Sequence, residues 1–466
     1  MFLRADIHHI RVSLCKNTRN IEKEHAKVHF FCRIKNKGIN LFQKQTHTRN
    51  MKRIIPIAVT AAMAFGTPKV WAQNYDETLV PQYTLPSVLT MASGAKVQSI
   101  EEWEKTQRPY LMKLLAEHVY GFTPTQKVKA TYKLLQENPN ALNQKATMQQ
   151  VLFTFTGNGK TVQATLLAYI PNNRKGRVPV FVGYNFKGNH TISHDKEILY
   201  SPYFERMADK TNKRLERGQQ TSRWPIELIV ENGYAVATMC YHDIYPDQKD
   251  GEAQSVVGLF PENTQPNRWQ SIGAWAWGSS RIADWLQQQP WADATCMALM
   301  GHSRQGKAAL WAGAQDTRFR VVISNNSGCG GAALSRREFG ETVETINASF
   351  PHWFCPNFAK YGKNLNALPV DQHTLLAMMA PRHVYVASAK EDRWADPRGE
   401  YLAAYHATDA YTLYGLKGIV TPAMPPVHRP EMQHVGYHIR EGIHDVTEYD
   451  WKCYIDFCNK AFGRNH

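Results

Sequence analysis

Four short apolar runs in the second half of the chain constrain its fold more than any other feature. They are YAVATMCY (234–241), TCMALM (295–300), RVVISNN (320–326) and HVYVASA (383–389). Compact, β-rich runs of this length are typical of strands buried on both faces of a parallel sheet. A stretch with helical spacing, roughly residues 270–288, separates the first two runs. The alternation therefore predicts a mostly parallel sheet with helices on both faces.

The region before these runs has a different pattern. MQQVLFTFTGNGKTVQATLLAYIP (148–171) alternates around Gly157-Asn158-Gly159, which predicts an antiparallel hairpin. Helical spacing at 100–121 ends at Gly121, and an amphipathic helix closes the chain over 446–462. An antiparallel start that leads into a parallel βαβ series indicates an α/β-hydrolase fold, a three-layer α/β/α sandwich. We expect one catalytic domain over residues 73–466.

Residues 51–73, MKRIIPIAVTAAMAFGTPKVWAQ, have the pattern of a secretory signal peptide. Lys52 and Arg53 precede an apolar stretch from Ile54 to Phe65, and small residues lie just before Gln73. A membrane span needs about 20 apolar residues, so this stretch is too short to be an anchor. We therefore expect residues 51–72 to be a signal peptide, residues 1–50 to be an upstream extension, and the protein to be exported to the periplasm or beyond the cell.

The net charge of +15 is concentrated in this leader. The first 72 residues contain 14 of the 55 lysines and arginines but 3 of the 40 acidic residues, which leaves about +4 for the remainder. A nucleic-acid partner is therefore not indicated. For an exported protein, Cys329 and Cys355 are candidates for a disulfide, with buried free thiols as the equal alternative.

The segment GHSRQGKAAL (301–310) places Ser303 in a Gly-x-Ser-x-Gly frame. The frame alone is weak evidence, but here it follows the predicted strand TCMALM and begins a helix. A nucleophilic serine on a sharp strand-to-helix turn requires this placement, because no flanking side chain fits against the turn. We therefore expect Ser303 to be the nucleophile and the backbone N–H of Arg304 to face the oxyanion hole.

A serine nucleophile needs a histidine base, which in this fold comes late in the chain. His444, in REGIHDVTEYDW, lies in a loop just before the final helix, while His434 and His438 are the nearby alternatives.

The acid that orients the imidazole is expected after a strand. Asp392 follows the strand HVYVASA directly, with Glu391 and Asp396 as alternatives; the previous strand ends in amides instead. We expect the triad Ser303, His444 and Asp392.

Four segments together resemble a known family. GHSRQGKAAL, SNNSGCGGAALSRREFGETVETIN, ASAKEDRWADPRGEY and GIHDVTEYDW are similar to segments of bacterial glucuronoyl esterases of carbohydrate esterase family 15, over about residues 90–463. The resemblance implies that the Arg304 side chain donates to the oxyanion. It also implies that Lys307, Glu341 and Trp394 bind the hydroxyls of a glucuronoyl ring. Fungal members carry their triad glutamate where this chain has Asn326, whereas similar bacterial members use an aspartate that matches Asp392.

These observations lead to an expected function. The resemblance implies a serine esterase that cleaves esters of (4-O-methyl-)glucuronic acid, as in glucuronoxylan and lignin–carbohydrate linkages, with no metal or cofactor. An acetylxylan esterase or another carbohydrate esterase on the same fold is the alternative enzyme, and an inactive carbohydrate-binding homologue is the alternative outside enzymes. Nothing in the sequence indicates an oligomer or a stable membrane insertion, and a monomer is expected.

Overall fold

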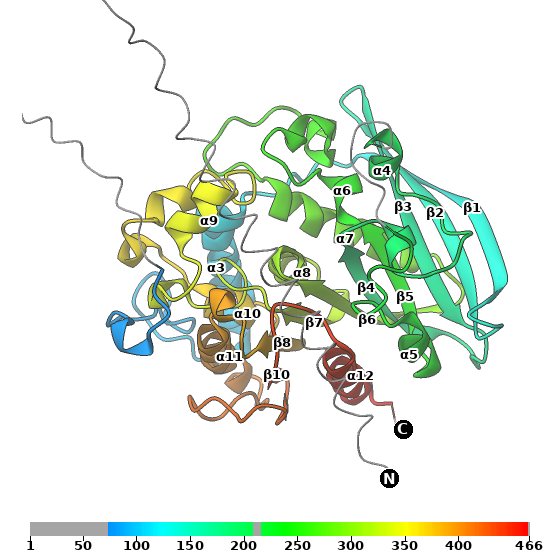
Figure 1. Ribbon diagram of the computed structural model, residues 1–466. Coiled ribbons are helices and arrows are strands. Elements are labelled where there is room, and N and C mark those ends of the chain that lie inside the picture. The colour runs from blue at the N-terminus through cyan, green and yellow to red at the C-terminus, as the bar shows by residue number, and fades with distance from the viewer. Residues whose placement is uncertain (1–72, 208–215, 465–466) are drawn as a thin grey trace, which may run out of the picture. The chain divides into compact units, whose positions relative to one another are not determined.

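The computed structural model describes residues 73–207 and 216–464 (Figure 1). The predicted signal peptide at 51–72 and the extension before it lie outside the described residues. Within the described ranges, no helix combines the length and the apolar character that crossing a membrane would require.

The described residues form a ten-stranded mixed sheet in the order β1-β2-β3-β5-β4-β6-β7-β8-β10-β9. The strands are β1 (Lys129–Ala141), β2 (Ala146–Gly157), β3 (Lys160–Pro171), β4 (Val178–Asn185), β5 (Ala235–Cys240), β6 (Ala292–His302), β7 (Phe319–Asn325), β8 (His383–Ala389), β9 (Glu431–Met432) and β10 (Val435–Arg440). The strands from β5 to β10 in this order pair in parallel, whereas β1, β2, β3 and β9 pair antiparallel with their neighbours. The predicted mostly parallel centre and antiparallel start are confirmed.

Helices cover both faces of this sheet. They are α2 (Ile100–Glu102), α3 (Arg108–Leu115), α4 (Pro202–Met207), α5 (Ile226–Glu231), α6 (Tyr241–Ile244), α7 (Ser271–Leu286), α8 (Arg304–Gln315), α9 (Val343–Ser349), α10 (Gln372–Ala377), α11 (Pro397–Thr412) and α12 (Glu448–Phe462). Buried residues of α3, α7, α8, α10 and α11 belong to one hydrophobic core, and those of α5 and α12 belong to the other. Figure 1 shows α8 and α12 on opposite sides of the central strands. This is the α/β-hydrolase arrangement that the sequence predicted.

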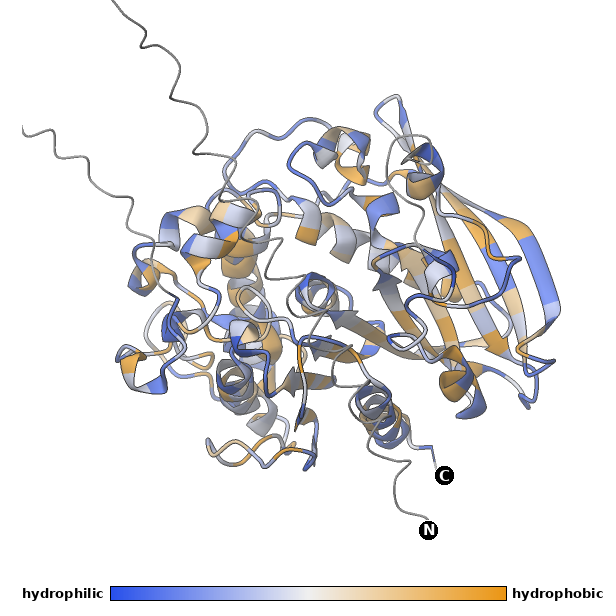
Figure 2. Ribbon diagram, in the orientation of Figure 1, coloured by the Kyte–Doolittle hydropathy of each residue, from blue (hydrophilic) through white to orange (hydrophobic). Residues whose placement is uncertain are grey.

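The alternation of side chains along the strands explains why both cores exist. In β8, Val384 and Val386 contribute to the core under α8, while Tyr385 and Ala387 contribute to the core under α12. Because both faces are buried, such strands need apolar residues at every position. The outer strand β1 instead alternates between exposed and partly buried positions, and Figure 2 shows hydrophilic and hydrophobic residues alternating there.

One parallel strand, β10, was not predicted. The strand β10 is completely buried, although it contains His438 and Arg440. Both side chains are paired with the buried carboxylate of Asp450 in α12, at 2.9 Å and 2.7 Å. Burying a charge is tolerated when it is paired and hydrogen-bonded, so the pairing lets this polar strand be buried between β8 and the edge strand β9. Cys329 and Cys355 are both buried free thiols.

Candidate active site

Ser303 lies on a sharp turn between β6 and α8. Its backbone has φ 57° and ψ −130°, which a residue with a Cβ rarely adopts. The turn leaves no room beside it, because a Cβ on Gly301 would lie 2.0 Å from the carbonyl oxygen of Gln305 and one on Gly306 would lie 2.9 Å from Cβ of Ser327. The glycines of the Gly-x-Ser-x-Gly frame are therefore required by close approach, as predicted.

His444 and Asp392 meet at the carboxyl end of the parallel strands. Nδ1 of His444 lies 2.5 Å from Oδ2 of Asp392, whose side chain is buried. Asp392 follows β8, and His444 lies in the loop between β10 and α12. Parallel strands end at the same edge of a sheet, which brings together two residues that are distant in the sequence.

The alternative histidines have other partners. His438 is completely buried in β10, between the hydroxyl of Tyr385 and the carboxylate of Asp450. His434 stacks on His383 with 4.5 Å between the ring centroids. Neither of the two lines the pocket that contains His444.

The two alternative acids, Asp396 and Glu391, have other surroundings. Asp396 is buried, caps the start of α11 through the backbone N–H of Gly399, and forms an ion pair with Arg337 at 2.8 Å. Glu391 is exposed. Among the three candidate acids, Asp392 is the one that contacts His444.

A pocket of about 290 Å³ brings all the predicted site residues together. It is lined by Ser303, Arg304, Lys307, Asn326, Ser327, Gly328, Glu341, Phe350, Trp353, Asp392, Trp394, Ala395 and His444. The seven residues predicted for catalysis and substrate binding are all among them.

The guanidinium of Arg304 is held at the pocket wall by Asp247 and by aromatic rings. Nη1 of Arg304 donates to Oδ2 of Asp247. The guanidinium carbon lies 4.7 Å from the ring centroid of Trp353 and 5.6 Å from that of Phe350, and these two rings stack on each other. A cation over aromatic faces is attracted by their quadrupoles. The side chain therefore has a defined orientation, although it remains partly exposed.

Asp247 itself is buried beneath the pocket. Its carboxylate also accepts hydrogen bonds from Nε1 of Trp353 at 2.8 Å, from the hydroxyl of Tyr241 at 3.1 Å and from Nε2 of His352 at 2.9 Å. Burial by itself would raise the pKa of Asp247, but the hydrogen bond from His352 and the charge of Arg304 outweigh it and hold the pKa below its usual range. Asp247 is therefore ionised at neutral pH.

Lys307 is buried, and its ammonium is largely used by the protein. Nζ donates to the carbonyl oxygens of Ser327 at 2.5 Å and Cys329 at 2.6 Å, and it lies 3.6 Å from Oε2 of Glu341. An ammonium has three hydrogens. Two therefore hold the 327–329 loop, and one remains to be shared between Glu341 and a ligand.

Glu341 and Trp394 also line the pocket and contact each other. Burial raises the pKa of Glu341, and the charge of Lys307 opposes that shift, as does a hydrogen bond with the Trp394 side chain. The backbone N–H of Glu341 also donates to the carbonyl oxygen of Trp394 at 3.0 Å. Trp394 is 39 % exposed, so it offers an open aromatic face beside a buried acceptor.

A further histidine packs against the base candidate with its ring tilted. The ring of His302 lies 4.5 Å from that of His444, and its Nδ1 contacts Oδ1 of Asn325 at 2.6 Å. Burial, together with the nearby His444 and Arg223, holds the pKa of His302 well below its usual range. His302 is therefore neutral at neutral pH and does not oppose a positive charge on His444.

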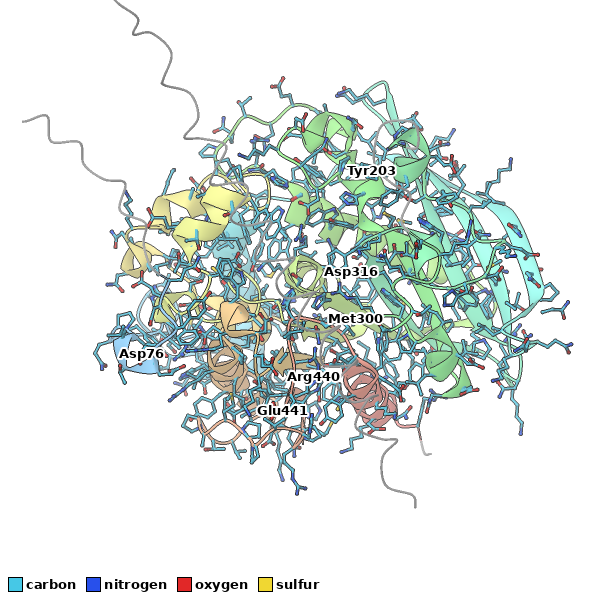
Figure 3. All side chains as sticks on the ribbon, viewed as in Figure 1. Asp76, Tyr203, Met300, Asp316, Arg440 and Glu441 are labelled. Carbon is cyan, nitrogen blue, oxygen red and sulfur yellow. The ribbon has the colours of Figure 1, made fainter. Side chains whose placement is uncertain are left out.

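The loop that carries His444 is held by Arg440. Its guanidinium donates to the carbonyl oxygens of Glu441, Ile443 and Asp445, while its Nε donates to Asp450 at 2.7 Å. Figure 3 labels Arg440 and Glu441, which follow one another from the end of β10. A buried guanidinium with four hydrogen bonds defines the path of a loop that contains no regular structure.

Sequence reasoning missed the residues that support the site. Asp247, His302 and Arg440 were not singled out, and Asn326 was noted only because the fungal glutamate is absent there. Their roles depend on contacts that only the folded chain makes. Asp247 lies 57 residues before Arg304 in the sequence. The side chain of His302 contacts Asn325, and that of Arg440 contacts Asp450. The one available signal was the position of His302 next to Ser303. Within the described ranges, no group of three His, Cys, Asp or Glu side chains could hold a metal ion.

The parallel sheet, the strained serine turn and the late histidine loop place the protein in the α/β-hydrolase class. A family model for fungal glucuronyl esterases matches residues 220–415. Carbohydrate esterase MZ0003, from an unknown prokaryotic organism, is 42 % identical over 420 residues, covering 87 % of this chain and 97 % of the relative.

Solved structures agree with these matches. A promiscuous CE15 esterase from a marine bacterial metagenome has a TM-score of 0.77 at 42 % identity, covering 83 % of this chain and 99 % of the other. The glucuronoyl esterase from Solibacter usitatus has a TM-score of 0.77 at 41 % identity, covering 83 % of this chain and 100 % of the other. The chain belongs to the glucuronoyl esterases of carbohydrate esterase family 15, and it is a carboxylic ester hydrolase.

Proposed function

We propose that this protein is a serine esterase that hydrolyses esters of glucuronic acid and its 4-O-methyl ether through an acyl-enzyme. One observation carries the proposal: the His444–Asp392 pair lines the same pocket as Ser303 and the oriented guanidinium of Arg304. This combination supplies a base, a nucleophile and a donor for developing negative charge.

Acylation would begin with Ser303. His444 takes the proton from the serine hydroxyl as the oxygen attacks the ester carbonyl, and Asp392 stabilises the imidazolium that forms. The carbonyl oxygen becomes an oxyanion, to which Arg304 donates. His444 then gives its proton to the leaving alcohol, and the uronoyl group remains bound to Ser303.

Deacylation repeats these roles with water. His444 takes a proton from the water that attacks the acyl carbonyl, and it returns this proton to Ser303 when the tetrahedral intermediate collapses. The uronic acid leaves the pocket and ionises in solvent. Each residue is therefore restored to its starting state.

The sugar ring would be bound by the pocket residues that take no part in the acyl transfer. Glu341 can accept hydrogen bonds from ring hydroxyls, Lys307 can donate one, and the open face of Trp394 can pack against the ring. Such groups favour a polyhydroxylated acyl group over acetate. We propose glucuronoxylan or a lignin–carbohydrate linkage as the source of the ester.

We further propose that the protein is exported after removal of residues 51–72, and that residues 73–466 form a single catalytic domain. The leader-like pattern of residues 51–73 supports the first statement. The single ten-stranded sheet supports the second. We propose that the enzyme acts as a monomer, because nothing in the sequence indicates an oligomer.

The substrate assignment is tested by comparing methyl glucuronate, benzyl glucuronate and acetylated xylan as substrates. We expect turnover of both glucuronate esters and little release of acetate. Glu341→Ala is expected to lower kcat/KM for the glucuronate esters much more than for a small acetate ester. An enzyme that releases acetate from xylan but leaves glucuronate esters intact would make acetylxylan esterase the correct assignment.

A further inference from the structure

Each basic side chain that lines the pocket has a carboxylate beside it. Nη1 of Arg304 donates to Asp247, Nζ of Lys307 lies 3.6 Å from Glu341, and Nδ1 of His444 lies 2.5 Å from Asp392. All three carboxylate side chains are buried. The pairing of Arg304 stands apart from the others, because Asp247 does not line the pocket and so cannot serve a ligand directly.

We propose that Asp247 is a positioning residue that balances the charge of Arg304, so that the pocket binds a neutral uronate ester in preference to the free uronate anion. This inference rests on the proposed function of the site. To that function the inference adds discrimination between the substrate and the product by their charge.

The formal charge of the pocket at each stage of the reaction explains why the pocket would favour the neutral ester over the anionic product. With His444 neutral, the three pairs carry two positive and three negative charges, so the resting pocket has a formal charge of −1. During acylation a proton moves from Ser303 to His444 while the oxyanion forms, and the total remains −1. Once the released acid has ionised in solvent, its return to the pocket would add a full negative charge and bring the total to −2. The product state is therefore the one that the pocket disfavours.

Without the charge of Asp247, this balance would be lost. An unpaired guanidinium is a strong binder of carboxylates, since bidentate pairs are among the strongest hydrogen bonds in proteins. The released acid would then occupy Arg304 and inhibit the next turnover. With Asp247 present, Nη1 of Arg304 already donates to a carboxylate. The buried Nε of Arg304 has no hydrogen-bond partner in the described part of the chain.

The same contact also aims the guanidinium. Asp247 is held in turn by Tyr241, His352 and Trp353, so its carboxylate cannot rotate freely. A donor that is oriented before the reaction stabilises the oxyanion without a reorganisation cost. Charge balance and orientation therefore have separate readouts: the first sets the affinity for the acid, and the second sets kcat.

The first experiment leaves Asp247 unchanged and compares how tightly the pocket binds the ester and the acid. The dissociation constants of methyl glucuronate and glucuronate are measured by calorimetry on the Ser303→Ala protein, which cannot turn the ester over. We expect the ester to bind at least as tightly as the acid. Clearly tighter binding of the acid would overturn the inference even if no Asp247 variant folds.

The second experiment adds Asp247→Asn to the same background. We expect the affinity for glucuronate to rise on the order of tenfold, from one new charge-assisted hydrogen bond, while the affinity for the methyl ester stays within about threefold. In the enzyme with Ser303 intact, Asp247→Asn is expected to lower kcat and to strengthen inhibition by glucuronate. An unchanged ratio of acid to ester affinity would overturn the inference.

Glu252→Gln is the matched control. It removes the same charge from the same loop, but Glu252 pairs with Arg268 rather than with Arg304. We expect it to leave the ratio of affinities and kcat unchanged, and an equal effect of both variants would assign the result to net charge alone and overturn the role of Asp247. If the unmodified enzyme hydrolyses no glucuronate ester, the proposed function fails; hydrolysis with an unchanged ratio means that the inference alone fails.

Discussion

The side-chain amide of Asn326 donates a hydrogen bond of 2.9 Å to Oδ2 of Asp392, the same oxygen that contacts Nδ1 of His444. Asn326 lies at the end of β7 with φ 46°, a conformation that Asn adopts more readily than most residues. Asn326 therefore holds the carboxylate that contacts His444. The carboxylate itself comes from the next strand, β8.

Asp392→Asn should strongly reduce the hydrolysis of every ester. The amide cannot stabilise a charged imidazole, and loss of a triad aspartate typically costs about 10⁴-fold in kcat. Turnover of methyl glucuronate and of a small acetate ester is the measurement. Glu391→Gln, the exposed neighbour, is the control and should retain full activity.

Asn326→Asp should shift the pH profile of kcat/KM to higher pH. Two carboxylates at hydrogen-bond distance disfavour double ionisation, so the pKa of one of them rises. The pair would then retain a proton in the weakly acidic range, where Asp392 must be charged to support His444. An acidic limb at the same pH as in the unmodified enzyme would contradict the contact between Asn326 and Asp392.

Lys307→Met should destabilise the fold as well as the site. It removes two hydrogen bonds to the 327–329 loop and leaves Glu341 buried without its cation, and breaking a buried pair typically costs about 3–5 kcal/mol. Chemical denaturation measures the free energy of unfolding. Lys307→Met combined with Glu341→Gln should recover part of this loss; a double variant no more stable than the single one would show that Glu341 is not the cause.

KM for glucuronate esters should rise as the pH falls through the raised pKa of Glu341. Burial favours the neutral form of this side chain, so it gains a proton at a higher pH than a free glutamate with a pKa of 4.5. Protonation replaces the charged acceptor for ring hydroxyls with a neutral carboxyl group that accepts more weakly, and a small acetate ester does not use this acceptor. The rise should therefore appear with glucuronate esters alone, and Glu341→Gln should have a high KM at every pH.

Glu400 should make the stability of the fold depend on pH. Burial raises its pKa to about 8, although Ser388 and the backbone N–H groups of Ser327 and Gly328 donate to it. Between about 4.5 and about 8 the folded state keeps a proton that the unfolded state loses, so the free energy of unfolding falls as the pH rises. Glu400→Gln should lack this slope, which thermal unfolding across that range would measure.

Much of the fold and the core of the site could be predicted because they depend on local patterns. Apolar runs identify strands that are buried on both faces, and Asp392 could be placed because it follows such a strand directly. The strand β10 was missed because His438 and Arg440 are polar residues typical of an exposed segment, whereas in the fold both are hydrogen-bonded to the buried Asp450 of α12. Asp247 was missed for a related reason, since only tertiary folding brings its loop beneath Arg304.

The proposed function requires Ser303 to attack a glucuronate ester with His444 as its base, and steady-state hydrolysis of methyl glucuronate tests this most directly. We expect turnover by the unmodified enzyme and a loss of about 10⁶-fold in kcat for Ser303→Ala, as in other enzymes with such a triad. Ser303→Ala that still hydrolyses the ester at a comparable rate would contradict it.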